Sequence, residues 1–165
     1  MDATTTERTD AMTDEGRARR GRRGGPGPVS RWVQHKANAR VIRKLRRGRG
    51  RFMGMDVLVV HHRGRRTGRP YETPVAWFPG DGGDRLVVAS GGGEQDPDWY
   101  RNLVARPDEA AIELAGGERV AVRPEPLAGA EREAAWARIA AAQPKIAEYQ
   151  AKTERRYPVV RLTVR

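Results

Sequence analysis

From residue 55 to its end, the sequence is a series of short apolar runs separated by turns rich in glycine. Each run is five to nine residues long and rich in valine, leucine or isoleucine, which is typical of β-strands. The expected strands are 55–62, 70–78, 85–90, 110–114, 118–123 and 158–164. About six short strands joined by hairpin turns predict a mainly β protein of the α+β class, with an antiparallel barrel or curled sheet. A Rossmann fold is excluded because no Gly-x-Gly-x-x-Gly motif follows a strand and opens a helix.

Helices are expected at only a few places in this part of the chain. Asp96 is a candidate N-cap, with Pro97 at the first position of a helix that ends near Ala105. Two more helices are expected at 130–142 and 144–153. Pro74 has no N–H to give to a neighbouring strand, so the second strand should contain a bulge or lie at a sheet edge there.

The chain before this domain divides into two segments. Residues 1–30 have no apolar periodicity and end in a Gly-, Pro- and Arg-rich stretch, which predicts a disordered basic tail. The tail could bind nucleic acid or anionic lipid, or it could be a solvated extension. Residues 31–50 are expected to form a basic amphipathic helix, capped by Ser30 and ending near Arg47, followed by a linker. The apolar positions of this helix are Trp32, Val33, Ala37, Val41, Ile42 and Leu45.

Two interpretations of the basic helix stay open. It could pack on the folded domain of residues 51–165 and present a solvated basic face. Alternatively, residues 31–51 could lie on an anionic membrane surface, where each basic side chain contributes ~1 kcal/mol to binding.

Positive charge is concentrated in one segment of this chain of 165 residues and net charge +11. Residues 31–70 contain thirteen Lys and Arg against one acidic residue, whereas residues 71–165 contain thirteen basic and fifteen acidic residues. Such a cluster is typical of proteins with a polyanionic ligand or an anionic surface as partner. Specific nucleic-acid binding is not expected, because only Trp32 and Phe52 could stack on bases within the basic segment.

Several classes of protein are excluded by what the sequence lacks. No apolar run approaches the ~20 residues that span a bilayer, and no apolar signal segment follows the start. The chain has no cysteine, which excludes disulfides and thiolate chemistry and fits a cytoplasmic location. His61 and His62 are neighbours on one strand and point to opposite faces, so they cannot form a metal pair and no metal is expected. No metalloprotease, serine hydrolase or P-loop motif occurs.

The turn after the first strand is the strongest candidate for a binding site. Residues 64–70 read Gly-Arg-Arg-Thr-Gly-Arg-Pro, which places three arginines and a hydroxyl in one short loop. Backbone N–H groups and guanidinium forks together suit an anion such as phosphate.

Four segments in series resemble the deazaflavin-dependent nitroreductases of actinobacteria, which are flavin/deazaflavin oxidoreductases on a split β-barrel. The segments are GRRTGRP at 64–70, TPVAWF at 73–78, VVASGGG at 87–93 and PDWYRNLVARP at 97–107. The resemblance covers about residues 52–164, and it keeps the order and spacing of the family's segments. It implies a split β-barrel of about six antiparallel strands with a few flanking helices.

The resemblance implies coenzyme F-420, an 8-hydroxy-5-deazaflavin with a phosphate and a polyglutamate tail, as the cofactor. The residues implied to hold the phosphate and the nearby tail are Arg65, Arg66 and Thr67. Those implied to line the channel of the deazaflavin ring are Tyr71, Thr73, Pro74, Val75 and Ala76. Those implied to bracket the ring and its ribityl chain are Val88, Ala89, Ser90 and Gly91. Those implied to close the site are Asp98, Trp99, Tyr100 and Asn102.

The implied activity is hydride transfer from reduced F-420 to a small apolar acceptor, a quinone or a nitroaromatic. Family members of this kind place several tyrosines three residues apart on the C-terminal helix. Here Tyr149 is present, while the position three residues earlier is Ile146, so the expected donor of the hydrogen bond or proton is Tyr149, with water as the alternative. The enzyme would be cytoplasmic and could associate peripherally with the inner face of the membrane. The alternatives are a non-catalytic flavin-, haem- or lipid-binding split barrel and, less favoured, a basic nucleic-acid-binding module.

Overall fold

The computed structural model describes residues 28–91 and 95–165, so the predicted tail at 1–30 lies almost entirely outside the described residues. The helices are α1 (Pro28–Arg46), α2 (Asp98–Ala105), α3 (Gly129–Ala142) and α4 (Pro144–Ala151). The strands are β1 (Arg51–Phe52), β2 (Met55–Arg63), β3 (Pro70–Pro79), β4 (Arg85–Val88), β5 (Ala111–Glu113), β6 (Arg119–Pro126) and β7 (Val159–Val164). All six predicted strands are present, and the two-residue β1 is an addition that the sequence did not indicate.

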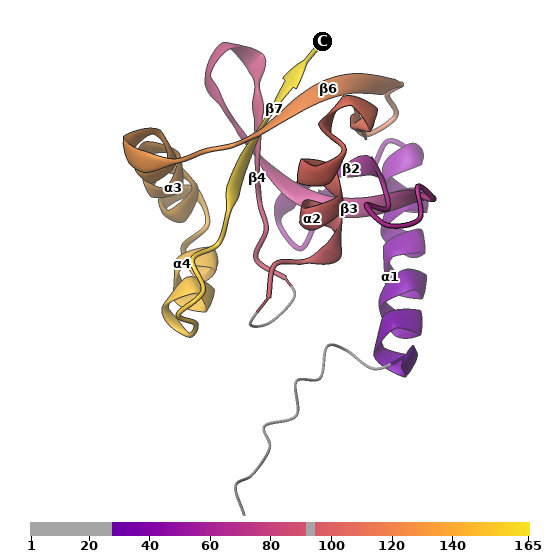
Figure 1. The fold of residues 1–165 in the computed structure, drawn as a ribbon, viewed down its shortest axis with the longest axis horizontal. Helices are drawn as coiled ribbons and strands as arrows, with labels where there is room; N and C mark the ends of the chain where they lie inside the picture. Colours follow the sequence, from indigo (N-terminus) through magenta and orange to yellow (C-terminus); the bar gives the residue numbers. More distant parts are fainter. Residues whose placement is uncertain (1–27, 92–94) are drawn as a thin grey trace, which may run out of the picture.

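The strands form one antiparallel sheet that closes on itself. The order is β1-β2-β3-β4-β7-β6-β5, and β5 also pairs with β2. At the closure, Val60 of β2 lies opposite Thr73 on one side and Ile112 on the other. The prediction of an antiparallel barrel is therefore confirmed. Figure 1 shows α3 and α4 together on one side of this barrel and α1 on the other.

Residues 57–60 of β2 are all apolar because both faces of the strand are covered there. Leu58 and Val60 point into the barrel interior, where they pack with side chains of β4, β5, β6 and β7. Val57 and Val59 point the opposite way and pack against α1. A separate apolar cluster beneath α3 and α4 contains Ile146.

Helix α1 packs on the outside of β2 through its last two turns. Ile42 and Leu45 are buried there and Val41 is partly buried, whereas Ala37 is exposed although the sequence pattern placed it on the apolar face. The helix begins at Pro28, so the predicted cap Ser30 lies within it and that prediction is wrong. Proline suits a first helical turn because the N–H that it lacks has no partner there.

Helix α2 also begins later than predicted. Its first residue is Asp98, and the cap position belongs to Pro97, which makes no side-chain capping bond. The Asp96 carboxylate accepts a hydrogen bond from Arg155 Nη1 at 2.7 Å instead. A charge-assisted bond to a largely buried guanidinium is stronger than a cap to backbone N–H groups, which explains the shift.

Pro74 lies at an edge, and the strand has no bulge there. The pairing of β3 with β2 runs without a break from Ala76 to Pro70, while β4 pairs only with residues 77–79 of β3. The stretch from Pro70 to Ala76 therefore has a strand neighbour on one side only. Its other edge is open to α1 and to ligands.

Candidate functional site

The β2–β3 connection, residues 64–69, is a tight loop that we call the arginine turn. The Gly64 N–H donates to the Arg69 carbonyl at 2.9 Å, and the Gly68 N–H donates to the Gly64 carbonyl at 2.7 Å. Gly68 has a φ of 68°, and a Cβ at Gly64 would lie 2.7 Å from Thr67 Oγ1, so both positions need glycine. The loop thus places its three arginines within a few residues of one another.

Asn102 of α2 holds Arg65 in place beneath the turn. Its Oδ1 accepts hydrogen bonds from the Arg65 backbone N–H at 3.1 Å and from Arg65 Nη1 at 3.0 Å. Arg65 Nη1 also donates to Asp98 Oδ1 at 3.0 Å. The side chains of Arg66 and Arg69 are exposed, and within residues 28–91 and 95–165 their guanidinium groups have no ion-pair or hydrogen-bond partner. The turn therefore offers one fixed and two free cations.

His62 continues this hydrogen-bonded chain into the barrel. Asn102 Nδ2 lies 3.4 Å from His62 Nδ1, and His62 Nε2 lies 3.1 Å from Thr73 Oγ1. Since the amide nitrogen can only donate, Nδ1 accepts and the ring proton sits on Nε2, which donates to the threonine hydroxyl. The ring also stacks on Tyr71 with 5.7 Å between centroids. Burial, with a further contribution from His61, lowers the pKa of His62 to about 4, so the ring is neutral at pH 7.

Replacement of His62 by glutamine should make the free energy of unfolding fall less as the pH is lowered from 7 to 5. A histidine with a folded pKa of about 4 costs stability as the pH falls below ~6.5, because the unfolded chain takes up a proton that the folded chain cannot. We expect wild type to lose about 2 kcal/mol from this group between pH 7 and pH 5. Urea unfolding of wild type and His62→Gln at both pH values measures the difference, and an equal loss in the two proteins would contradict it.

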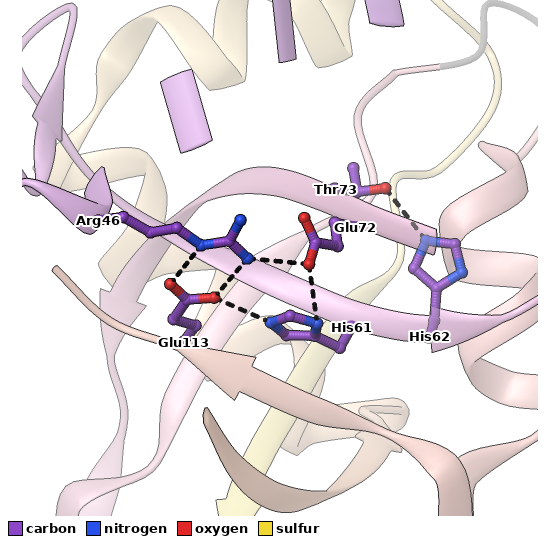
Figure 2. A network of polar contacts seen from close by, with 6 residues as sticks. All are labelled: Arg46, His61, His62, Glu72, Thr73 and Glu113. Carbon is purple, nitrogen blue, oxygen red and sulfur yellow. Dashed lines mark hydrogen bonds and ion pairs between the residues drawn. The ribbon is translucent and has the colours of Figure 1, made fainter. Parts of the chain in front are cut away.

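His61, on the opposite face of β2, belongs to a second polar network that binds α1 to the barrel (Figure 2). Arg46 donates to both carboxylate oxygens of Glu113 at 2.8 and 2.9 Å and to Glu72 at 2.8 Å. His61 Nε2 lies 3.2 Å from Glu113, and burial is the main cause that lowers the His61 pKa. The hydrogen bond from Arg46 lowers the pKa of Glu113, so the carboxylate stays charged. Opposite orientations of the two histidines are thus confirmed, and this network positions α1 on β2, β3 and β5.

Arg155 fixes the end of β4, and the sequence analysis missed it. Its Nη1 donates to the Ala89 carbonyl at 3.1 Å, and its Nη2 donates to the carbonyls of Ser90 at 3.2 Å and Gly91 at 3.0 Å. The guanidinium also lies over the Tyr157 ring, 4.8 Å from its centroid. No motif marks this arginine, because its acceptors are main-chain atoms more than sixty residues away.

A groove of about 680 Å³ lies between α1 and the outer face of the sheet. Its helix side is lined by Ala37, Asn38, Arg40, Val41, Arg43, Lys44 and Arg47. Its sheet side is lined by Phe52, Met55, Val57, Pro74, Val75 and Ala76. The four cations recur at i, i+3, i+4 and i+7 along α1 and form one exposed stripe. The groove is therefore apolar on its sheet side and cationic on its helix rim, with no acidic residue in its lining.

The structure brings most of the predicted site residues into two regions. The arginine turn, Tyr71, Thr73, Asp98 and Asn102 form one hydrogen-bonded and stacked cluster. Residues 74–76 line the groove, at the other end of the same open stretch of β3.

The other predicted residues make contacts that belong to the fold. Val88 and Ala89 are buried, and the Ala89 N–H donates to the Pro158 carbonyl at 2.9 Å. The side chains and the backbone at the end of β4 therefore contribute to the fold. Trp99 and Tyr100 pack on the barrel core with their rings edge to face.

Tyr149 is exposed on α4, and its described contacts join it to neither region. Lys152 lies over its ring at 5.8 Å, and its carbonyl accepts a hydrogen bond from the Tyr157 hydroxyl at 3.3 Å. Ile146 is buried in the cluster under α3 and α4, so this position supports the core rather than a ligand.

Comparison with known proteins shows which family the chain belongs to. The profile of the F-420H(2)-dependent quinone reductases matches residues 32–164. The chain belongs to this family. It is 34% identical to Rv3178 of Mycobacterium tuberculosis, a protein named for the same activity, over 73% of this chain and 100% of that one.

Two solved structures support the same fold. The F-420-H2-dependent reductase FDR-A superposes with a TM-score of 0.56 at 30% identity, covering 64% of this chain and 92% of that chain. A structure described as a domain-swapped dimer superposes with a TM-score of 0.57 at 26% identity, covering 81% and 98% of the two chains. The barrel is therefore the split barrel that the resemblance implied.

Membership in the quinone reductase family implies F-420 as the cofactor, and the residues present fit it. The arginine turn supplies the exposed guanidinium groups of Arg66 and Arg69 and the exposed hydroxyl of Thr67, which suits a phosphate. No acidic residue occurs within the turn itself to compete with that anion.

Proposed function

We propose that this member of the family binds F-420 along the open edge of β3 and reduces a quinone-type acceptor in the adjoining groove. The observation that carries the proposal is that one uninterrupted stretch of β3 connects the arginine turn to the groove lining. From Pro70 to Ala76 this stretch is seven residues long and spans ~20 Å, which is long enough for a cofactor with a ring at one end and a phosphate beyond it.

Each part of the chain has a distinct role in this proposal. Arg66 and Arg69 bind the phosphate and the tail, while Arg65 is held by Asn102 and shapes the turn. His62, as a neutral donor, fixes Thr73 at the start of the ring channel. Pro74, Val75 and Ala76 give the ring an apolar wall without side chains that titrate. When bound, reduced F-420 would supply a hydride to the quinone, and one proton from Tyr149 or water would complete the quinol.

Tyr149 remains the proposed donor of a hydrogen bond or proton to the acceptor. Supporting this, its helix is tied to the segment that carries Arg155: Gln150 Nε2 donates to the Arg155 carbonyl at 2.8 Å. Replacement by phenylalanine should lower kcat about a hundredfold with little change in F-420 affinity, since general acids contribute ~10²-fold or more. Steady-state kinetics measure this; an unchanged kcat would remove Tyr149 from the mechanism.

The acceptor and the place of the reaction follow from the groove. Its apolar sheet side suits a quinone better than a polar substrate, and a nitroaromatic would fit the same chemistry. The cationic stripe of α1 supports peripheral association of residues 31–51 with an anionic membrane, where apolar quinones reside. No helix in the described part of the chain is long and apolar enough to span a membrane.

Titration of the protein with oxidised F-420, FMN and FAD, followed by tryptophan fluorescence, tests the cofactor. We expect F-420 to bind at micromolar concentration or tighter and the two flavins to bind more weakly. Turnover of reduced F-420 with a short-chain naphthoquinone then tests the activity. Tight F-420 binding without turnover would favour a non-catalytic carrier, and no F-420 binding would refute the proposal.

A further inference from the structure

The β1–β2 hairpin presents an apolar tip to solvent beside the groove. Met53 is 80% exposed and Phe52 is 41% exposed. Phe52 pairs with Met55 across the hairpin, so Met53 and Gly54 form the two-residue turn. Large apolar side chains at a hairpin tip do not stabilise the folded state when they are exposed to water.

The backbone of the tip is also unfavourable for the residue that occupies it. Met53 has a φ of 51° and Gly54 a φ of 80°, the left-handed combination of a type I′ turn. Asparagine is preferred at the first of these positions, and methionine costs ~1 kcal/mol there. Met53 is the one non-glycine residue with positive φ in the described ranges. An exposed and strained methionine is explained most simply by a partner that it binds.

The charges around this tip identify the partner. Phe52 and Met55 line the same groove as the cationic stripe, so the tip and the stripe share one rim. Arg49 and Arg51 flank the tip, and the acidic group beside them, Asp56, is paired with Arg51 at 3.6 Å. An apolar wedge surrounded by cations matches an anionic bilayer, with acyl chains beneath phosphate headgroups.

We propose that Phe52–Met55 inserts into an anionic phospholipid bilayer while the stripe of α1 binds the headgroups. In that orientation the groove opens toward the acyl layer, and its apolar acceptor enters from the membrane rather than from water. This inference rests on the proposed function for the identity of the acceptor, but the membrane contact itself does not depend on it.

Vesicle sedimentation with the full chain tests the contact. We expect binding to vesicles of equal phosphatidylglycerol and phosphatidylcholine, and at least tenfold weaker binding to phosphatidylcholine alone. Met53→Asn should bind the mixed vesicles about fivefold to tenfold more weakly. Because asparagine relieves the turn, this variant should be at least as stable as wild type, so weaker binding cannot be ascribed to misfolding.

Controls separate the inference from the proposed function. Val120→Ser removes an apolar side chain on β6 that is 38% exposed and lies outside the tip, and it should bind vesicles like wild type. Met53→Asn should reduce a water-soluble quinone at the wild-type rate. With a long-chain quinone in mixed vesicles, this variant should be several times slower than wild type. Equal vesicle binding by Met53→Asn and wild type would overturn the inference. So would a failure of wild type to bind vesicles, including the case where it binds duplex DNA instead. Failure of wild type to reduce the soluble quinone would instead refute the proposed function.

Discussion

Replacement of Arg65 and Arg66 together by alanine is expected to weaken F-420 binding at least a hundredfold. In the proposed site Arg66 forms charge-assisted contacts with the phosphate, which contribute ~1.5–3 kcal/mol, and Arg65 keeps the turn in shape through Asn102. The two single variants should differ in kind. Arg66 is exposed, so Arg66→Ala should lose about tenfold in affinity with no change in stability. Arg65 is bound to Asn102 and Asp98, so Arg65→Ala should lose affinity and destabilise the turn as well.

Fluorescence titration at several salt concentrations measures these losses. Arg123→Ala, which removes an exposed arginine from β6, is the matched control and should bind F-420 like wild type. Wild-type affinity in the double variant would show that the phosphate lies elsewhere, and the cationic stripe of α1 would be the next place to test. A loss in the control of the same size would show that the effect comes from net charge alone.

Replacement of Arg155 by methionine is expected to destabilise the protein by about 3 kcal/mol and to weaken F-420 binding. Its side chain is 12% exposed and donates to three main-chain carbonyls and to Asp96. Without the guanidinium, each of these acceptors loses a donor, at a cost of ~1–3 kcal/mol for each one that stays buried. Since the resemblance implies that Ala89, Ser90 and Gly91 bracket the ring, we expect affinity to fall together with stability.

Urea unfolding, with F-420 titration of the folded variant, measures both effects. Arg156→Met is the matched control: this neighbour is 65% exposed and pairs with Glu133 at the surface, so its loss should cost no more than ~1 kcal/mol. Arg155→Lys should recover only part of the loss, because one ammonium cannot reach four acceptors spread over a guanidinium. A stable Arg155→Met with wild-type affinity would show that β4 ends in this shape without Arg155.

Local features of the sequence were sufficient for much of this fold. Strand positions followed from apolar runs and turn glycines, and each strand was found within a few residues of its predicted place. The arginine turn was recognised because its glycines and arginines are consecutive, and its anion chemistry requires only those residues. Helix starts were less reliable: Ser30 and Asp96 fit a cap by type, but α1 begins earlier, and Asp96 binds Arg155.

Long-range contacts had to come from the tertiary structure. The bond between His62 and Asn102 joins residues forty positions apart, and Arg155 reaches carbonyls across more than sixty. The groove exists only because α1 packs on the outer face of β2, and the periodicity of its apolar residues does not say which strand they contact. Sequence patterns report a residue's own conformation and polarity, which are local properties. A side chain's partners depend on which distant segments the barrel closure brings together, and in this protein those partners build the site.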